Sequence, residues 1–241
     1  MKVVVETENI SKSFGDKHIL KGVSLTVAEG ENVVILGRSG TGKSVFIKCI
    51  VGLVEPDEGS IKVLGKDVLN INRNDMNDIR RDIGFLFQGA ALYDSMSVRE
   101  NLAFPLRTVK MSKDEVEAQV KEALDNVGLA DAIDKMPAEL SGGMRKRVGL
   151  ARAIIMKPKI ILYDEPTTGL DVITSREISQ LILEIQKKYN TGSIIITHDM
   201  PCAKITANRI VVLQNGKFAA EGTYDELENH ENDSVRSFFE F

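Results

Sequence analysis

The sequence has little of several features that mark particular classes of protein. Its 241 residues include no run of about 18 apolar residues, so we expect no transmembrane helix. Its two cysteines, Cys49 and Cys202, lack the spacing of metal ligands, which favours two free thiols in a reducing cytosol. The formal charge is only −4, and basic residues are mixed with acidic ones along most of the chain, which argues against a dedicated nucleic-acid binder.

The beginning of the sequence does not have the pattern of a targeting segment. Residues 1–14 alternate between apolar and polar side chains and carry Glu6 and Glu8, so we do not expect a signal peptide. Hydrophobic residues make up 43% of the chain, which is ordinary for a globular protein with ample core. A chain of this length is expected to form one large α/β domain or one domain with an insertion.

Hydrophobic periodicity predicts strands that alternate with helices, interrupted by a longer helical stretch. Strands are expected at residues 1–10, 23–37, 59–65, 83–88, 159–166 and 192–199, with a hairpin and its Asn-Gly turn at 209–222. Helices are expected at residues 42–53, over much of 90–156, at 175–190, from residue 200, and at 223–230 and 234–241. The buried apolar strands imply a parallel sheet covered on both faces and split by a helical insertion.

A glycine-rich stretch, GRSGTGKS, matches the whole P-loop pattern G-x-x-x-x-G-K-[ST] and lies between an apolar strand and a helix. Its glycines let backbone N–H groups turn toward phosphates, where a side chain would collide. Lys43 can reach the β- and γ-phosphates, and the Ser44 hydroxyl can bind Mg²⁺. The predicted nucleotide-binding residues of this loop are Gly37, Arg38, Ser39, Gly40, Thr41, Gly42, Lys43 and Ser44.

Two adjacent carboxylates follow a hydrophobic strand in KIILYDEP. Asp164 stands at the C-terminal tip of the strand, and tips of this kind line the ligand crevice of a parallel sheet. A carboxylate there can hold Mg²⁺ directly or through water. Glu165 follows and is expected to project to the other side, so that one acid can act on a metal and the other can polarise water.

A third motif, ELSGGMRKRVGLARAI, has the layout of an anion-binding site at a helix start. Ser141 is expected to cap the helix, and Gly142 and Gly143 follow it. The basic residues near the start are Arg145, Lys146, Arg147 and Arg152. A capped, basic, solvent-facing helix explains these charges, but it does not explain two successive glycines, which weaken a helix start. A second contact with an anion explains the glycines.

Together, LSGGM, the P-loop and ILYDEP resemble the nucleotide-binding subunits of ABC transporters, and smaller motifs follow in the same order. Phe14 in SKSFG resembles the A-loop aromatic residue that stacks on adenine. Gln88 in FLFQ resembles the Q-loop glutamine, a contact for Mg²⁺ and water. Asp171, which ends TGLD, resembles the D-loop, and His198 in IIITHD resembles the switch histidine near the γ-phosphate. The resemblance covers nearly the whole chain.

This resemblance implies a fold and a division of the chain. The implied fold is α/β: a P-loop NTPase (RecA-like) core with a mostly parallel sheet, an N-terminal antiparallel β subdomain and a helical insertion. Residues 1–241 would form one ATPase domain. Within it, residues 1–88 and 157–241 would form the core and the β subdomain, and residues 89–156 would form the helical subdomain with the signature motif.

The resemblance also implies ATP hydrolysis with Mg²⁺. Glu165 is expected to be the general base, with His198 and Gln88 completing the catalytic set. The side chains expected to hold Mg²⁺ are Ser44, Gln88 and Asp164. Besides the P-loop, the residues expected at the nucleotide are Phe14, Ser141, Gly142, Gly143 and Asp171.

The partners follow from the same resemblance. Two copies of the chain are expected to dimerise head to tail, so that the signature helix of one copy covers the ATP held by the P-loop of the other. A transmembrane permease on separate chains would hold this dimer at the cytoplasmic side of the inner membrane. No nucleic acid is expected as a partner.

A narrower resemblance concerns the ATPases of Mla/Mce-type lipid transporters (MlaF-like proteins). It rests on GRSGTGKSVFIK, where Val45 replaces a second hydroxyl residue, on FQGAALYDSMSVRENLAFPLR, and on LSGGMRKRVGLARAI, where Met144 replaces the usual glutamine. The stretch after Gln88 is where the coupling helix of the permease docks in this family, and Leu92 and Phe104 are either contacts of that kind or core of the insertion. The resemblance implies transport of phospholipid or another hydrophobic substrate, with an Mce-domain protein and an accessory subunit as further partners.

A different class remains open: an ABC ATPase that acts outside transport, in cofactor assembly, the cell envelope, translation or DNA maintenance. Translation types usually carry two cassettes, and DNA-repair types carry a long coiled coil in the insertion. This sequence has one cassette and no sustained heptads. A GTPase or kinase is disfavoured, because the sequence has neither a base-reading NKxD motif nor a kinase catalytic loop.

Overall fold

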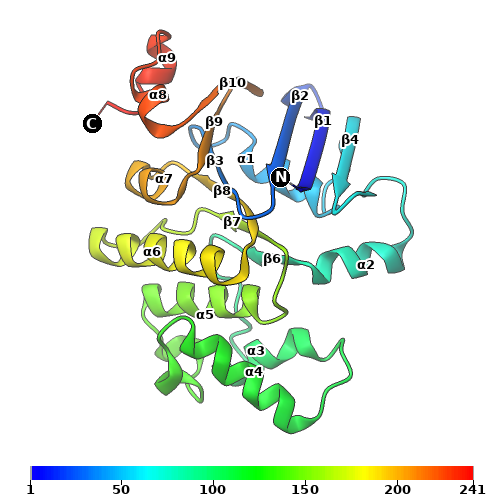
Figure 1. Ribbon diagram of the computed structural model, residues 1–241, viewed down its shortest axis with the longest axis vertical. Helices are drawn as coiled ribbons and strands as arrows, with labels where there is room; N and C mark the ends of the chain where they lie inside the picture. The colour runs from blue at the N-terminus through cyan, green and yellow to red at the C-terminus, as the bar shows by residue number, and fades with distance from the viewer. Residues whose placement is uncertain (1, 241) are drawn as a thin grey trace.

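Apolar strands build a central sheet that is almost entirely parallel, as the sequence predicts. The structure is a computed structural model that describes residues 2–240. The strands of this sheet lie in the order β10-β9-β3-β8-β7-β6 (Figure 1). Their bounds are β3 (Asn32–Leu36), β6 (Ile83–Leu86), β7 (Ile160–Asp164), β8 (Gly192–Thr197), β9 (Arg209–Gln214) and β10 (Lys217–Gly222). Neighbouring strands from β9 to β6 pair in parallel, and β10 forms the predicted hairpin with β9.

A second, antiparallel sheet is formed largely by the first part of the chain. Its order is β2-β1-β4-β5, with bounds β1 (Val3–Phe14), β2 (Lys17–Ala28), β4 (Glu58–Val63) and β5 (Lys66–Asp67). The prediction of one strand over residues 23–37 is wrong, because the chain turns between β2 and β3 and enters the other sheet. Gly30 lies in this turn with a φ of +74°, a conformation that glycine adopts without steric cost.

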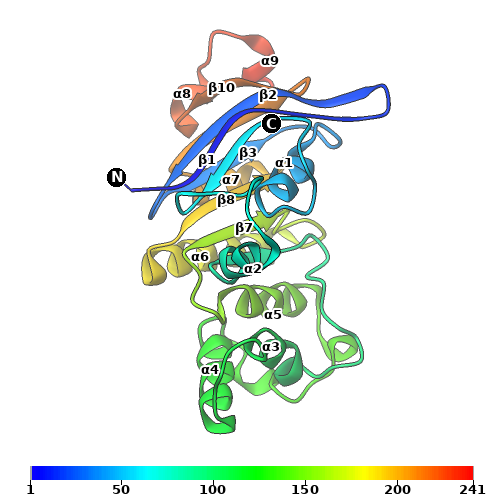
Figure 2. The same ribbon diagram turned by 90° about the vertical axis from the view of Figure 1, so that its right-hand side faces the viewer.

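Alternate residues of each central strand face different layers. In β3, Val33 and Ile35 join a core with the first helix and the antiparallel sheet, whereas Val34 and Leu36 join a core with helices on the other face. The helices on the two faces are α1 (Lys43–Ile50), α6 (Val172–Tyr189) and α7 (Met200–Thr206). Figure 2 shows α1 beneath the antiparallel sheet, so this helix is enclosed between two sheets.

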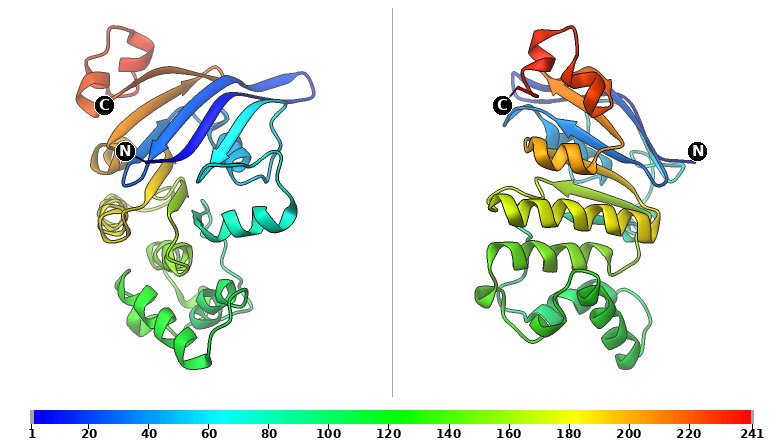
Figure 3. Two further views of the ribbon diagram at one scale, coloured as in Figure 1. Left: turned by 45° about the vertical axis from the view of Figure 1, so that its right-hand side comes forward. Right: turned by 60° about the vertical axis from the view of Figure 1, so that its left-hand side comes forward.

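Three further helices form one end of the molecule, at the bottom of Figure 1. They are α3 (Val98–Leu106), α4 (Lys113–Asp125) and α5 (Gly142–Ile154), and the short 3₁₀ turns η1 (Ala130–Ala132) and η2 (Pro137–Glu139) lie between α4 and α5. One continuous core joins α3 and α4 through α5 and α6 to the central sheet. Figure 3 shows α8 (Tyr224–Glu228) and α9 (Asp233–Arg236) at the opposite end.

The sequence missed one helix and misplaced another. No helix was predicted over α2 (Arg73–Arg81), which lies between β5 and β6. Helix α6 begins at Val172, three residues before the predicted start, because the Asp171 side chain caps it. Met1 and Phe241, which belong to the predicted domain range, lie outside the described residues. Within residues 2–240, no helix is long and apolar enough to cross a membrane.

A buried amide closes the loop that leads into α3. The Asn101 side chain is fully buried; its Oδ1 accepts a hydrogen bond from the Tyr93 N–H at 2.8 Å. Its Nδ2 donates to the carbonyls of Tyr93 at 3.1 Å and Met96 at 2.9 Å. These bonds satisfy backbone groups outside regular secondary structure, so Asn101 holds the part of the loop from Tyr93 to Met96.

We predict that Asn101→Ala lowers the free energy of unfolding by about 1–3 kcal/mol, because buried backbone groups lose their partners. Chemical denaturation followed by circular dichroism measures this change. The exposed Asn74 on α2 provides the control, and Asn74→Ala is expected to change the free energy by less than about 0.5 kcal/mol. Equal stability of the two variants would contradict the assigned role of Asn101.

Candidate functional site

The loop between β3 and α1 is built to surround an anion. Gly40 and Gly42 have φ angles of +78° and +106°, and Gly42 is the residue before the first helical turn. A Cβ atom at Gly37 would lie 2.7 Å from the Leu213 carbonyl oxygen, so no larger residue fits there. Helix α1 has no acidic residue in its first turn, so the N–H groups and the helix dipole keep a positive potential at this end.

The ammonium group of Lys43 lies inside this loop. It donates hydrogen bonds to the carbonyl oxygens of Gly37 at 2.7 Å and Arg38 at 3.2 Å. It also lies 3.7 Å from Glu165 Oε1, with both side chains largely buried. Burial lowers the pKa of Lys43, and the nearby Glu165 carboxylate opposes this shift. The loop therefore presents a cation between the backbone groups and the acids at the end of β7.

Asp164 and Glu165 take different neighbours, as the sequence predicts for an acid pair with two roles. Ser44 Oγ donates a hydrogen bond to Asp164 Oδ1 at 3.1 Å, which places a hydroxyl and a carboxylate oxygen side by side. Burial raises the pKa of Asp164, and the hydrogen bond from Ser44 opposes this rise. These two oxygen donors are the kind of ligand that Mg²⁺ prefers.

Glu165 adopts a left-handed backbone conformation that turns its side chain away from Asp164. Its φ is +51°, which is uncommon for a residue other than glycine. His198 Nδ1 lies 2.8 Å from Glu165 Oε2. An ionised carboxylate can only accept, so the His198 Nδ1–H is the donor in that state. Thr168 Oγ1 donates to the same oxygen at 3.0 Å. The Glu165 carboxylate is thus fixed by three side chains from different segments: Lys43, Thr168 and His198.

A cavity of about 280 Å³ brings most of the predicted residues together. The predicted residues that line it are Phe14, Ser39, Gly40, Gly42, Lys43, Ser44, Gln88, Glu165 and His198. Phe14 is 53% exposed at the end of β1, and Lys12 Nζ lies 5.5 Å from the centre of its ring. An exposed aromatic ring at the rim of a cavity provides a flat surface for stacking, and its exposure argues against a role in the core.

The other predicted residues do not line this cavity. Gly37 and Arg38 line a neighbouring cavity that they share with His198. Thr41 Oγ1 donates to the Arg38 carbonyl at 2.9 Å, which closes the loop from within. Asp171 accepts hydrogen bonds from the N–H groups of Ile173 and Thr174, both at 3.0 Å, so its side chain is the cap of α6.

The start of α5 has the predicted cap, and the basic residues near it differ in exposure: Arg145 is exposed, whereas Lys146 is buried. Ser141 Oγ accepts a hydrogen bond from the Met144 N–H at 3.2 Å. Gly142 and Gly143 follow it, and none of these residues lines the cavity around the P-loop. Each basic residue of this helix also donates to a carbonyl group of its own chain, and the Lys146 side chain is buried. The basic residues are Arg145, Lys146, Arg147 and Arg152.

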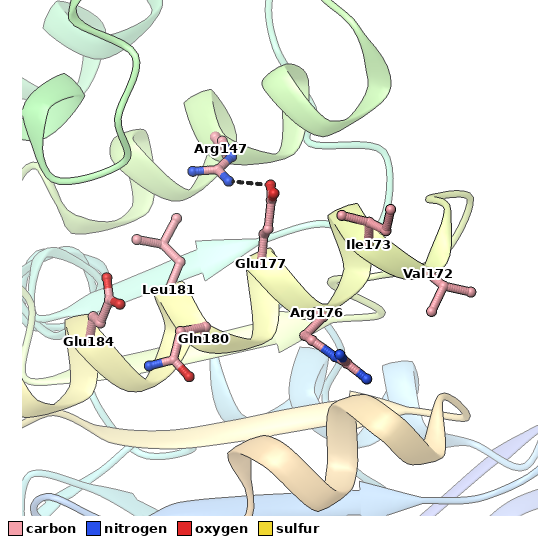
Figure 4. Close-up of a pocket in the computed structure, with 8 residues that line it drawn as sticks. All are labelled: Arg147, Val172, Ile173, Arg176, Glu177, Gln180, Leu181 and Glu184. Atoms are coloured by element: carbon pink, nitrogen blue, oxygen red, sulfur yellow. Dashed lines mark hydrogen bonds and ion pairs between the residues drawn. The ribbon is translucent and has the colours of Figure 1, made fainter.

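A larger groove of about 510 Å³ lies along α6, away from the P-loop (Figure 4). Arg147 of α5 reaches across to it and forms an ion pair with Glu177 at 2.8 Å. Val172 and Ile173 are highly exposed at one end of this groove. The groove holds neither the lysine nor the acid pair, so we place the chemistry in the smaller cavity.

Sequence reasoning missed several residues at the cavity. Ile19 and Val45 line it, and Thr168 orients Glu165. Ile19 lies in β2, the strand that follows Phe14 in the chain. Its closeness in sequence to the predicted stacking residue is the signal that could have identified it. Nothing in the sequence marked Thr168 as different from the neighbouring Thr167, whose hydroxyl donates to Asp199 instead.

Comparison with known proteins agrees with this geometry. The sequence model of the ABC transporter family matches residues 20–168. The chain is 39% identical over 224 residues to the methionine import ATP-binding protein MetN of Clostridium tetani, covering 93% of this chain and 70% of that protein. It is 41% identical over 239 residues to the probable ribonucleotide transport ATP-binding protein mkl of Mycobacterium tuberculosis, covering 99% of this chain and 67% of that protein.

Solved structures agree as well. The structure of cbiO1 from Clostridium perfringens, part of the transporter complex cbiONQ, superposes with a TM-score of 0.88 at 30% identity, covering 98% of this chain and 94% of that chain. The dimeric structure of MJ0796, a bacterial ABC transporter cassette, superposes with a TM-score of 0.84 at 33% identity. The match covers 91% of this chain and 98% of that chain. The chain therefore belongs to the ABC transporter family, as one of its ATP-binding cassettes with ATPase activity.

Proposed function

We propose that this chain is the ATPase subunit that energises transport of phospholipid or another hydrophobic substrate through a separate membrane permease. The proposal of ATP hydrolysis at this site is supported mainly by the position of the Glu165 carboxylate. It lies beside Lys43 of the P-loop and His198, in a cavity bounded by the P-loop and Phe14. The whole chain is one ATPase domain in this proposal, with residues 89–156 as its helical subdomain.

In the proposed reaction, the side chains divide into binding and catalytic roles. Phe14 stacks on adenine, and the P-loop N–H groups with Lys43 hold the phosphates. A water molecule attacks the γ-phosphorus, and the bond from that phosphorus to the β–γ bridging oxygen breaks. Glu165 accepts the proton of the attacking water, which leaves ADP and inorganic phosphate. His198 holds the carboxylate from one side, and Gln88 lies at the same cavity to position water.

Mg²⁺ fits the donor set at this site. Ser44 Oγ and Asp164 Oδ1 lie 3.1 Å apart, and Ser44 and Gln88 both line the cavity at the P-loop. Among residues 2–240, no group of three or more His, Cys, Asp or Glu side chains could hold a metal alone. This agrees with a cation that keeps few protein ligands and completes its shell with phosphate and water. The ion would neutralise charge on the phosphate oxygens.

We infer that the working unit is a head-to-tail dimer. Ser141, Gly142 and Gly143 begin α5 outside the cavity of their own chain, so they are available to a nucleotide bound by a second copy. Asp171, the cap of α6, would belong to the same interface, because its hydrogen-bond partner Thr174 lies against Gly143: a Cβ atom at Gly143 would be 2.6 Å from Thr174 Cγ2. The MJ0796 cassette, which is similar over most of this chain, is described as dimeric.

The proposed cargo rests on sequence resemblance to the Mla/Mce-type ATPases. The segment after Gln88 carries this resemblance, and it presents two partly exposed aromatic side chains, Tyr93 and Phe104, with ring centres 5.0 Å apart. A permease helix could dock there, and an Mce-domain protein and an accessory subunit would complete the complex. Methionine import is the second candidate, because a relative with that printed function is 39% identical. An ATP-binding subunit need not contact the cargo, so these relatives do not decide it.

We predict that Glu165→Gln lowers ATP turnover by about 10²–10⁴-fold while ATP still binds, because the general base is lost and the shape is kept. Steady-state phosphate release and a nucleotide-binding titration measure the two quantities. Glu184→Gln, a change of the same kind on the exposed face of α6, is expected to leave turnover unchanged. Turnover like that of the wild type in Glu165→Gln would refute the assignment.

Mixed dimers test the sharing of sites between chains. Lys43→Ala and Ser141→Arg should each abolish turnover alone, because every composite site then has one damaged half. In a dimer of one chain of each kind, one site receives both damaged halves and the other receives none. We expect mixing the inactive proteins to restore turnover, measured as phosphate release at a fixed total concentration. No recovery, with dimer exchange shown by labelled subunits, would argue against the shared site.

The cargo can be tested by purifying the Glu165→Gln protein from native membranes in mild detergent with ATP and identifying what accompanies it by mass spectrometry. A permease, an Mce-domain protein and enriched phospholipid are expected. A permease with a soluble amino-acid-binding protein would support the methionine alternative and reject the lipid. Soluble assembly factors or ribosomes without a permease would favour an ABC ATPase that acts outside transport.

A further inference from the structure

A lysine on α5 is buried against the catalytic edge of the sheet. Lys146 is only 5% exposed, although it belongs to a run of basic residues. Its ammonium group donates a hydrogen bond to the Glu165 carbonyl oxygen at 2.9 Å and another to the Gln88 carbonyl oxygen. The helix that begins at the signature motif is therefore bonded directly to the main chain of the two residues proposed to act on water.

The burial of this charge is costly unless it is compensated. Burial lowers the pKa of Lys146, and the nearby Asp164 and Glu165 carboxylates oppose that shift. An apolar side chain of similar volume in such a place is often neutral or favourable for stability. Packing alone therefore gives no reason for a lysine at this position. The reason is indicated by its ammonium group, which donates to two main-chain carbonyls.

The conformation of the Glu165 main chain depends on hydrogen bonds to its two peptide groups. The residue has a φ of +51°, so its backbone needs support from its surroundings. On one side, the Glu165 N–H donates to the Ile196 carbonyl at 2.9 Å, which ties the residue to β8. On the other side, the Glu165 carbonyl accepts a hydrogen bond from Lys146 Nζ at 2.9 Å and a longer one from the Thr168 N–H at 3.4 Å. These bonds hold both peptide groups of the residue whose side chain contacts Lys43 and His198.

Two further residues on the same face of α5 hold the segment after Gln88. A Cβ atom at Gly149 would lie 2.9 Å from Leu86 Cδ1 and 3.1 Å from Ala90 Cβ, so the helix and the segment are in close contact. Arg152 donates to the carbonyls of Ala91 at 2.8 Å and Ala90 at 3.0 Å. Lys146, Gly149 and Arg152 are spaced by about one helical turn, so one side of α5 contacts the chain from Gln88 to Ala91.

We propose that Lys146 is a positioning residue for ATP hydrolysis: its ammonium group holds the Glu165 main chain in the conformation that aims the carboxylate, and it fixes Gln88 to the same helix. The inference rests on the proposed role of Glu165 as general base. In this arrangement α5 has two functions at separate points, since its first residues face a second copy of the chain and its second turn orients the base of its own chain.

The test compares Lys146→Met and Lys146→Gln in the full chain. Methionine has a similar length but no donor, and glutamine is neutral but keeps two N–H donors for the two carbonyls. For Lys146→Met we expect kcat to fall by roughly 10- to 100-fold, because displacing a reacting group by about 1 Å has an effect of this order. In Lys146→Met, the KM for ATP and the denaturation midpoint should change little, and amide hydrogen exchange should become faster in segments 88–91 and 165–168. Lys146→Gln should have a kcat between that of Lys146→Met and that of the wild type.

Arg147→Met is the matched control. It removes a cation from the neighbouring position of α5, where the side chain contacts the Val127 carbonyl and Glu177 and not the catalytic edge. We expect this variant to keep kcat. A kcat for Lys146→Met within about two-fold of the wild type would overturn the proposal. A loss of kcat that follows the denaturation midpoint, or one that Arg147→Met shares, would also overturn it, because the role would then be structural.

Glu165→Gln, measured in parallel, separates this inference from the proposed function. If Glu165→Gln loses turnover and Lys146→Met does not, only the positioning role of Lys146 fails. If Glu165→Gln keeps turnover, the assignment of the base fails, and the positioning role fails with it.

Discussion

The rest of the site depends on the burial of four ionisable side chains at one edge of the central sheet. The four residues are buried, with exposed fractions of 5–8%: Lys43, Lys146, Asp164 and Glu165. A charge in such a place is tolerated only when an opposite charge or several hydrogen bonds compensate it. Lys43 lies beside Glu165, Asp164 accepts from Ser44, and Lys146 bonds to main-chain carbonyls. Lys43 and Ser44 connect the P-loop to the acids at the end of β7, and Lys146 connects α5 to the Glu165 main chain, so these three segments hold one another in place.

The parallel sheet makes this arrangement possible. The strands β3, β8, β7 and β6 are neighbours in that order and run in the same direction, so their C-terminal ends meet at one edge. The P-loop follows β3, His198 follows β8, the acid pair ends β7, and Gln88 follows β6. These segments are far apart in the sequence, but the strands that precede them are adjacent in the sheet. The order of the strands therefore brings the segments together, and the loops contribute the functional side chains.

Much of this could be predicted because the signals were local. The P-loop glycines, the acids after an apolar strand and the cap at Ser141 are each defined by a few consecutive residues, and the hairpin at residues 209–222 by its Asn-Gly turn. Helix α2 was missed because Met76 and Ile79 are the only apolar residues in its sequence, which is too few for a periodic pattern. The strand predicted at residues 23–37 was too long because apolar residues continue on both sides of Gly30, and only the sheets decide that the chain turns there.

The basic residues of α5 show why the remaining features could not be predicted. A lysine in a basic run is usually solvated, and the sequence near Lys146 contains no acceptor that would draw it inward. Its partners lie 58 and 19 residues away and become neighbours only when β6 and β7 pair. The pairing of these strands also explains why different parts of α5 have different surroundings. Lys146 connects α5 to the end of β7 in its own chain, while Gly142 and Gly143 lie outside the cavity at the P-loop. ATP can drive closure of a dimer only if it binds the closed state more tightly than the open one. In the proposed dimer, α5 would be attached to one chain while its first turn faces the ATP bound by the other, so closure would add contacts to ATP without rearranging the first chain.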